Sequence, residues 1–391
     1  MSRTPYHAVV ARNVFDGVTV LDDHAVIIEG AHIVDVVPRN DLPAPVPAYA
    51  LPGGAWLAPG FIDVQVNGGG DVLFNDTPTP AGVNAIAAAH RRYGTTGLLP
   101  TLISDTPEKM RVAMAAAQSA AGANPSVLGI HFEGPFLSPE KPGVHKPAMF
   151  RDPEPRDLEL LTGWPAGTVL VTLAPERVPA EFIASLVQAG VRVSLGHSMA
   201  TYAETQAALT AGLTGFTHLF NAMRPLASRE PGPIAAALEA PAAWFGMIVD
   251  GAHVAPEMLR LALRGAAHPM LVTDAMPPVG GARSSFTLYG QEITVRDGRC
   301  TRADGTLAGA AIDMASCVRN SVRDLHVPLT SALRFASTEP AEFLGLGTML
   351  GRLAPGFRAD MVAFDPSDVR VLGTWVAGES EHDVAPERVR A

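Results

Sequence analysis

The chain has 391 residues, of which 47% are apolar and 17% charged, and its formal net charge is −10. This length and composition allow one large domain with a smaller companion, or two ordinary domains. Lys and Arg form no run, which argues against binding to nucleic acid or to an acidic membrane surface. We therefore expect no nucleic-acid partner and no membrane partner.

The cysteine content and the N-terminal sequence indicate the cellular compartment of the protein. Cys300 and Cys317 do not form a CxxC pair, so neither a disulfide framework nor a thiolate metal site is expected. The N-terminus lacks a basic segment followed by an apolar one, and no stretch reaches the roughly 18 apolar residues of a membrane span. These features predict a cytoplasmic protein.

Short strands are expected at both ends of the chain. Residues 7–50 read as strands joined by turns, without amphipathic helices between them. The same pattern returns in Arg358–Asp365 and Asp368–Gly378. We therefore predict one small β-sandwich domain formed from residues 1–58 and 351–391, although each part could instead be an independent flap.

Between these ends, strands and helices alternate, which is typical of parallel βα units. Over residues 59–350 this pattern predicts a (β/α)8 TIM-like barrel, whose functional sites lie at the carboxyl ends of the strands. A doubly wound open sheet is the alternative, but the first βα turn carries Asn67-Gly68-Gly69-Gly70 in place of GxGxxG. Residues 280–310 contain turn signals and are expected to form β-hairpins that contribute to a lid. The expected barrel strands are Phe61–Val66, Gly97–Leu102, Val127–Phe132, Thr168–Leu173, Arg192–Leu195, Gly215–His218, Phe245–Val249 and Met270–Thr273.

The stretch around Glu133 indicates an active site. The preceding strand ends abruptly at this residue, because Gly134 and Pro135 cannot continue a β-ladder. His145 follows in a loop broken by proline and glycine, so its ring is held in a constrained loop and not on an apolar helix face. Alternatively, Glu133 could cap a helix and His145 could be a surface residue.

Metal-binding or acid–base side chains end further strands, namely His197, His218, His253 and Asp274. Glu133, His197 and His218 offer one carboxylate oxygen and two imidazole nitrogens, which suits zinc or another borderline divalent ion and leaves a position for water. The ion would lower the pKa of this water and polarise a carbonyl, and Asp274 would act as general base and acid. Each histidine alone could instead be a satisfied buried ring. Asp274 could be a fourth ligand or a salt-bridge partner.

Polar residues after His218 could bind an oxyanion. Arg229 lies in a loop bounded by proline and glycine, and its planar guanidinium could hold a phosphate together with His253. Asn221 and neighbouring backbone N–H groups could add donors. The alternative is a surface arginine paired with Glu230.

Several motifs follow one another in a fixed order: PGFIDVQVNG, GTTGLLPTL, GIHFEGPFLSPEKPGVHKP, SLGHS, FTHLFNAM, REPG, VDGAHV and LVTDAM. This series closely resembles the N-acetylglucosamine-6-phosphate deacetylases of the amidohydrolase superfamily, with a match from about Pro59 to Asp274. GRLAPGFRADMVAFD resembles the return of that superfamily into its β domain. The combination is specific, although PGFID alone would be a weak signal.

The resemblance implies hydrolysis of the N-acetyl group of N-acetylglucosamine 6-phosphate to glucosamine 6-phosphate and acetate, with a metal-bound water as nucleophile. Glu133, His197 and His218 then take the metal positions, Asp274 the general base and acid position, and His145 a catalytic position near the substrate carbonyl. Family members are typically homodimers, so a homodimer is expected, and part of the phosphate site could cross its interface. The expected substrate-binding residues are Gln65, His145, Asn221, Ala222, Arg229, His253 and Leu307.

One departure from the superfamily pattern concerns the metal count. Many members carry His-x-His on the first barrel strand to hold a second metal, whereas this chain has Gln65-Val66-Asn67. Amides are poor zinc ligands beside imidazole. We therefore expect one divalent ion per chain, most simply zinc, with iron or another divalent ion as the alternative.

Other functions fit parts of the pattern. An amidohydrolase acting on cyclic amides or on another N-acetyl sugar phosphate is the nearest alternative. A catalytically silent barrel would have a broken ligand set, which the intact Glu133, His197, His218 and Asp274 series disfavours. A metal-independent sugar-phosphate isomerase would stay active in the presence of a chelator.

Overall fold

The computed structural model describes residues 6–380. These residues pack into two compact units. The first contains the described residues up to Ile62, His90–Gly97 and those from Met314 onward, and the second contains Asp63–Ala89 and Leu98–Asp313. This division cuts through two barrel strands, so the expected domains 1–58, 59–350 and 351–391 remain a prediction.

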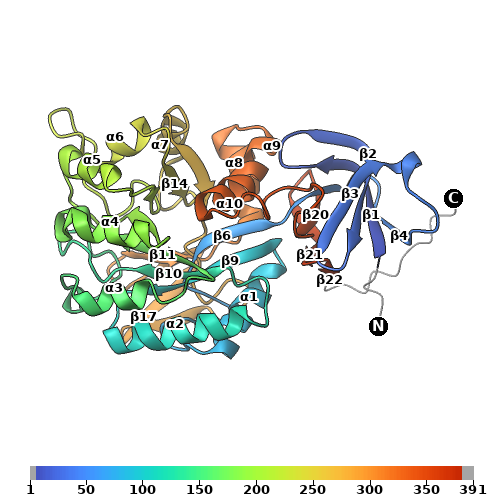
Figure 1. The fold of residues 1–391 in the computed structure, drawn as a ribbon. Helices are drawn as coiled ribbons and strands as arrows, with labels where there is room; N and C mark the ends of the chain where they lie inside the picture. Colours follow the sequence, from blue (N-terminus) through green and yellow to red (C-terminus); the bar gives the residue numbers. More distant parts are fainter. Residues whose placement is uncertain (1–5, 381–391) are drawn as a thin grey trace. The chain divides into compact units, whose positions relative to one another are not determined.

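Strands from both ends of the chain form one sheet, as predicted (Figure 1). Its order is β22-β21-β20-β5-β1-β2-β3, with β4 paired to β1, so the C-terminal strands join the N-terminal ones through β20 and β5. The strands are β1 (Tyr6–Phe15), β2 (Val20–Glu29), β3 (His32–Pro38), β4 (Ala48–Ala50), β5 (Trp56–Pro59), β20 (Met361–Asp365), β21 (Arg370–Val376) and β22 (Glu379–Ser380).

The sheet curls around a shared apolar core. Alternate residues of β1 point to opposite faces, so Val9 joins a cluster with Val26 and Met361, whereas Val10 packs on the other face. His32, the first residue of the edge strand β3, forms a bridge with Arg358, just before β20. The edge strand β3 therefore approaches β20 across one core, as the strands of a small β-sandwich do.

The barrel is the predicted parallel sheet, in the order β15-β14-β13-β12-β11-β10-β9-β6. It closes through a parallel bridge between Val66 and Ala275, where the backbone N–H of Asn67 also donates to Ala275 O at 2.9 Å. The strands are β6 (Phe61–Val66), β9 (Thr95–Ile103), β10 (Gly129–Glu133), β11 (Thr168–Leu173), β12 (Arg192–Leu195), β13 (Gly215–Phe216), β14 (Trp244–Met247) and β15 (His268–Leu271). Every residue of β6, β9 and β10 is buried, as expected for a parallel sheet covered on both faces.

Some strands end earlier than the sequence predicted. The expected strand Gly215–His218 stops at Phe216, and the expected strand Met270–Thr273 stops at Leu271. Just beyond these ends, His218 and Asp274 adopt positive φ angles of 34° and 50°. His218 lies in a turn, and Asp274 directly precedes the bridge residue Ala275, so neither side chain projects from a strand.

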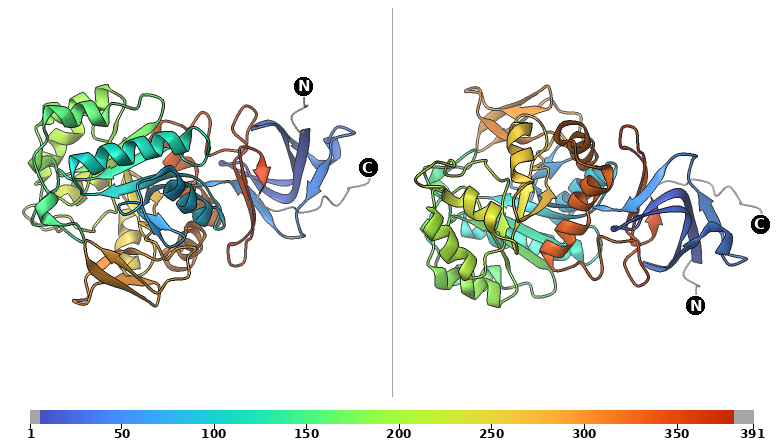
Figure 2. Two further views of the ribbon diagram at one scale, coloured as in Figure 1. Left: turned by 90° about the horizontal axis from the view of Figure 1, so that it is seen from below. Right: turned by 90° about the horizontal axis from the view of Figure 1, so that it is seen from above.

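In the second compact unit, helices lie outside the barrel strands (Figures 1 and 2). One of them, α2, begins with Thr106 accepting from Lys109 N and with Pro107 in the first turn. The helices are α1 (Pro80–Arg91), α2 (Pro107–Ala121), α3 (Pro155–Leu161), α4 (Ala180–Gln188), α5 (Tyr202–Thr210), α6 (Gly232–Glu239), α7 (Pro256–Ala262), α8 (Met314–Leu325), α9 (Leu329–Ala336) and α10 (Thr338–Leu344). Short 3-10 turns are η1 (Arg39–Asp41), η2 (Pro147–Met149) and η3 (Pro175–Arg177). Among the described residues, no helix is both long and apolar enough to cross a membrane.

The segment after β15 forms hairpins, as predicted, and we call it the insert sheet. It is an antiparallel sheet in the order β16-β17-β18-β19, drawn in orange in Figure 2. Its strands are β16 (Ser285–Leu288), β17 (Gln291–Arg296), β18 (Arg299–Thr301) and β19 (Leu307–Ala310). Its apolar face packs on Ile103, Val144 and Met276 of the barrel unit, beside the small β7 (Gly68–Gly69) and β8 (Val72–Leu73) pair. The insert sheet is thus anchored to the barrel by a buried apolar cluster.

Candidate metal centre and active site

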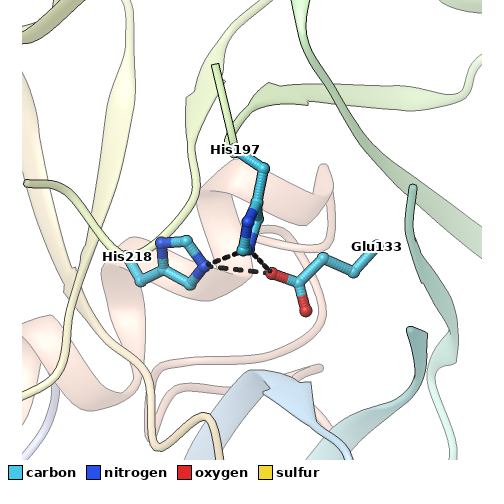
Figure 3. Close-up of side chains that lie close together, drawn as sticks. All are labelled: Glu133, His197 and His218. Atoms are coloured by element: carbon cyan, nitrogen blue, oxygen red, sulfur yellow. Dashed lines mark hydrogen bonds and ion pairs between the residues drawn. The ribbon is translucent and has the colours of Figure 1, made fainter. Parts of the chain in front are cut away.

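Three buried side chains at the carboxyl ends of barrel strands meet at one point (Figure 3). Glu133 is the last residue of β10, and His197 and His218 follow β12 and β13. The two Nε2 atoms lie 3.1 and 3.0 Å from Glu133 Oε1 and 3.2 Å from each other. Ligand atoms around a tetrahedral zinc ion with bonds of ~2.0–2.1 Å are about 3.3 Å apart. The donor set and its spacing therefore fit one divalent ion.

Surrounding contacts orient these groups. His197 Nδ1 lies 2.8 Å from Lys141 O, and this contact orients the ring so that Nε2 faces Glu133. Burial opposes ionisation of Glu133, but its hydrogen bonds from the neighbouring histidines hold its pKa well below the usual range. Burial likewise opposes the charged form of His218, and the Glu133 carboxylate outweighs this and raises the His218 pKa. The carboxylate is thus kept ionised, as a metal ligand must be.

Asp274 lies in the same cavity and is held by two amides. Asn67 Nδ2 and Gln65 Nε2 donate to its Oδ1 at 2.6 and 3.2 Å. Burial, and then the charge of Glu133, raise the Asp274 pKa to about 6. A carboxyl group with such a pKa can both accept and return a proton near neutral pH.

Asp63 accepts buried hydrogen bonds near the Asp274 segment of the barrel. Thr273 Oγ1 donates to Asp63 Oδ2 at 2.5 Å, and Gln65 N donates to Asp63 Oδ1 at 3.2 Å. Burial raises the Asp63 pKa to about 7. Asp63 therefore joins β6 to the residue before Asp274, a role that we did not predict from the sequence.

His145 lies beside the candidate metal ligands. Its Nε2 is 3.9 Å from Glu133 Oε2, and its ring centroid is 4.4 Å from that of His197. The loop can approach so closely because Gly143 has no side chain: a Cβ there would lie 3.0 Å from His197 Cε1. His131, two residues before Glu133 in β10, bonds Thr101 and Thr172 and is not in the Glu133 cluster.

A cavity of about 220 Å³ opens over these groups. Of the expected substrate-binding residues, His145, Asn221, Ala222, His253 and Leu307 line it. Gln65 is buried beneath Asp274, and Arg229 is exposed; neither belongs to the lining.

Sequence reasoning missed several lining residues, namely Asn67, Ile103, Gly143, Val144, Met276, Thr306 and Gly309. Gly143 and Val144 precede His145 in a motif that we had already selected, so their presence could have been foreseen. Thr306 and Gly309 come from the insert sheet and lie close in the chain to Leu307, which the resemblance already assigned to the substrate site.

The two expected phosphate-binding residues differ in their surroundings. His253 Nδ1 lies 2.7 Å from Asp250 Oδ2. Burial opposes ionisation of Asp250, but the hydrogen bond with His253 prevails and lowers its pKa, which favours an ionised acceptor behind the ring. Arg229 has no ion pair within residues 6–380, and Glu230 accepts instead from the backbone N–H groups of Tyr202 and Gly232. The alternative of an Arg229–Glu230 pair is therefore wrong.

A closed parallel barrel with a buried Glu-His-His cluster and an aspartate at its carboxyl rim defines the class of metal-dependent hydrolases. Residues 56–381 match the amidohydrolase family, and residues 7–56 match the NagA composite domain. The chain belongs to the amidohydrolase family and is an enzyme.

Several proteins similar to this chain are deacetylases of N-acetylated sugar phosphates. An N-acetylgalactosamine-6-phosphate deacetylase of Shewanella sp. (strain ANA-3) is 44% identical over 85% of this chain and 84% of its own length. An N-acetylglucosamine-6-phosphate deacetylase of Haemophilus influenzae is 35% identical over 92% of this chain and 95% of its own. The crystal structure of the N-acetylglucosamine-6-phosphate deacetylase of Pasteurella multocida has a TM-score of 0.93 at 36% identity, covering 97% of this chain and 100% of that one. The resemblance predicted from the motifs is confirmed.

Proposed function

We propose that the enzyme hydrolyses the N-acetyl group of N-acetylglucosamine 6-phosphate, releasing glucosamine 6-phosphate and acetate. The observation that carries this proposal is the convergence of Glu133, His197 and His218 beside Asp274 in one cavity. Deacetylases of this specificity among the similar proteins support the choice of substrate.

Glu133, His197 and His218 would hold a divalent ion, which supplies the Lewis acidity that makes water nucleophilic enough to attack an amide. Asp274 would accept a proton from the attacking water and pass it to the departing nitrogen. The amides of Asn67 and Gln65 fix the Asp274 carboxylate, because both donate to one of its oxygens and leave the other free. His145 would direct its Nε2 toward the substrate carbonyl and stabilise the charge that develops there.

We propose one ion per chain, with zinc as the preferred metal. The amides of Gln65 and Asn67 stand where a second metal would need imidazoles, and both are already engaged with Asp274. One carboxylate and two imidazoles suit zinc, although iron(II) would accept the same donors.

We also propose how the substrate is held. His253, backed by Asp250, and the exposed Arg229 would bind the phosphate, whereas Asn221, the backbone of Ala222, and Leu307 would contact the sugar. A cytoplasmic homodimer is part of this proposal. Two buried cysteines that form no disulfide are consistent with a reducing compartment, and an arginine outside the cavity lining could serve the site of a second copy.

N-acetylgalactosamine 6-phosphate is a second candidate substrate. The observation in its favour is the 44% identity to a deacetylase of that specificity. The two sugars differ only in the configuration at C4, so the same amide chemistry would serve both.

The test is release of acetate by the purified enzyme from both sugar phosphates and from unphosphorylated N-acetylglucosamine, with and without a chelator. The proposal expects turnover of a phosphorylated sugar that the chelator abolishes and zinc restores. A preference for the galactosamine derivative would select the second candidate. Equal turnover of the unphosphorylated sugar would remove the phosphate-binding roles, and activity in the chelator would overturn the metal-dependent mechanism.

A further inference from the structure

The insert sheet makes two hydrogen bonds to the segments that surround His145. Tyr289 Oη donates to Ser104 O, and Arg302 Nη2 donates to Val144 O, each at 2.6 Å. Ser104 follows β9 and touches the His145 ring, whereas Val144 immediately precedes His145 in the chain. The insert sheet thus bonds both the residue that contacts the His145 ring and the residue that precedes His145 in the chain.

Ser104 determines which nitrogen of His145 carries the proton. The backbone N–H of Ser104 points at His145 Nδ1 at 3.3 Å, and Ser104 Oγ is 2.9 Å from the same nitrogen. A backbone N–H can only donate, so Nδ1 must be an acceptor and the proton of the neutral ring resides on Nε2. Nε2 is the nitrogen on the side of Glu133, so this tautomer presents a donor to the cavity.

The peptide group that makes this bond is itself fixed. Asn75 pairs with Ile103 through two hydrogen bonds, from Ile103 N to Oδ1 at 3.1 Å and from Nδ2 to Ile103 O at 2.9 Å. Asn75 thereby holds the peptide that carries the Ser104 N–H, and Tyr289 holds the next peptide through its carbonyl. Burial raises the pKa of the Tyr289 hydroxyl, which therefore remains a donor.

We propose that Tyr289 and Arg302 are positioning residues for His145, so that the insert sheet aligns its Nε2–H with the substrate carbonyl. This inference rests on the proposed role of His145 in amide hydrolysis. The insert sheet is then a fixed part of the active site and not only a cover over it.

A purely structural role makes a different prediction. The insert sheet is already anchored by the buried cluster of Ile103, Val144, Met276 and its own apolar residues. If the hydrogen bonds of Tyr289 and Arg302 only added stability, their loss would lower the unfolding temperature. It would not change the contribution of His145 to kcat. A double-mutant cycle separates the two cases, because residues that act through one another show non-additive effects.

The cycle uses Tyr289→Phe, His145→Ala and the double variant, with kcat, KM and thermal unfolding measured on the metal-loaded enzyme. We expect Tyr289→Phe to lower kcat about tenfold with little change in KM, as for a small misplacement of a group that acts in the transition state. In the His145→Ala background the same change should have almost no effect on kcat. Arg302→Met should lower kcat in the same way. Arg302→Lys should keep part of the kcat that Arg302→Met loses.

Tyr202→Phe is the matched control, because it removes a phenol that donates to Glu239 at the surface. It should leave kcat unchanged. An equal loss for Tyr289→Phe with and without His145, or no loss at all, would overturn the inference.

A spectroscopic measurement keeps this inference separate from the proposed function. Nitrogen NMR of the histidine rings, with His145 identified by the spectrum of His145→Ala, should show an unprotonated Nδ1 in the native enzyme. Tyr289→Phe should mix the two tautomers. A native enzyme without deacetylase activity would overturn the proposed function only, whereas a proton on Nδ1 would overturn the positioning of His145.

Discussion

At the scale of single residues, the site depends on residues beyond the strand ends whose backbone has an unusual conformation. His197, His218 and Asp274 have φ angles of 48°, 34° and 50°. Such angles cost non-glycine residues roughly 1–3 kcal/mol each and persist only where the surroundings fix them. Here the fixed partners are Lys141 O for His197 and the two amides for Asp274.

Asp274→Asn tests the proton shuttle. The amide side chain cannot accept the proton of the attacking water, so we expect kcat to fall by about 10²–10⁴-fold. The metal content should stay at the native level, because Asp274 is not one of the three clustered ligand atoms. Elemental analysis and acetate release on the same sample check this, and near-normal turnover would show that another group moves the proton.

His197→Ala tests the metal site. It removes one of three donors, so the purified variant is expected to lose the bound ion together with activity. His131→Gln is a suitable control, because His131 is also buried but bonds Thr101 and Thr172 and does not belong to the ligand cluster. Retention of a stoichiometric ion by His197→Ala would contradict the assigned ligand set.

At the scale of elements, the loop after β10 and the junction between β6 and β15 shape the site. The loop brings the Lys141 carbonyl and the His145 ring to His197. The junction carries Asp63, which accepts from Gln65 N on its own strand and from Thr273 Oγ1 just after β15. Both features belong to the barrel unit and depend on close backbone approach.

Gly143→Ala tests the close approach of the loop. The added Cβ would lie 3.0 Å from His197 Cε1 at a φ of +53°, so the ring must shift. We expect metal affinity to fall by about 10–100-fold, as for other changes to groups that orient a ligand. Gly190→Ala is matched to it, with a φ of +85° but no atom within 4 Å of the new Cβ. The control should lose stability without losing metal, and equal metal affinity in the two variants would contradict the argument.

Asp63 predicts a pH dependence of stability. Its pKa is raised by burial from 3.8 to about 7, so the native state holds its proton more tightly than the unfolded chain does. This contribution to the free energy of unfolding is fully present below pH 3.8 and is lost as the pH rises to about 7. The expected loss is of order 4 kcal/mol. Denaturant unfolding of the native protein and of Asp63→Asn across this range checks it, and the variant should lack this component of the slope. Parallel curves would show that Asp63 does not titrate in this range.

At the scale of the whole molecule, the metal ligands all belong to one of the two compact units. Glu133, His197 and His218 lie in the unit formed by Asp63–Ala89 and Leu98–Asp313. An ion that binds only the folded barrel stabilises it by mass action.

Chelation should therefore lower the unfolding temperature of the native protein. A free ion concentration one hundred times the dissociation constant contributes about 2.7 kcal/mol to the free energy of unfolding. Calorimetry before and after chelation, and again after zinc is added, measures the change. His197→Ala should show no response to either treatment, and a chelator effect of native size in this variant would place the stabilising ion elsewhere.

Much of the fold could be predicted because local sequence patterns indicate the strands. Phe61–Val66 and Thr168–Leu173 are strands with the predicted bounds, since continuous apolar runs suit a sheet buried on both faces. The ends of the strands at His218 and Asp274 were less predictable, because a positive φ at a non-glycine residue depends on contacts with distant segments.

The sequence by itself determined the barrel, the donor atoms and the family. Alternating strands and helices permit few architectures, and each donor is the residue at or near a strand end. Only the tertiary structure decided that Gln65 and Asn67 hold Asp274, that Arg229 lies outside the cavity lining, and that Tyr289 reaches the neighbour of His145. Such contacts join residues far apart in the chain, so they depend on barrel closure and loop conformation, which no local pattern encodes.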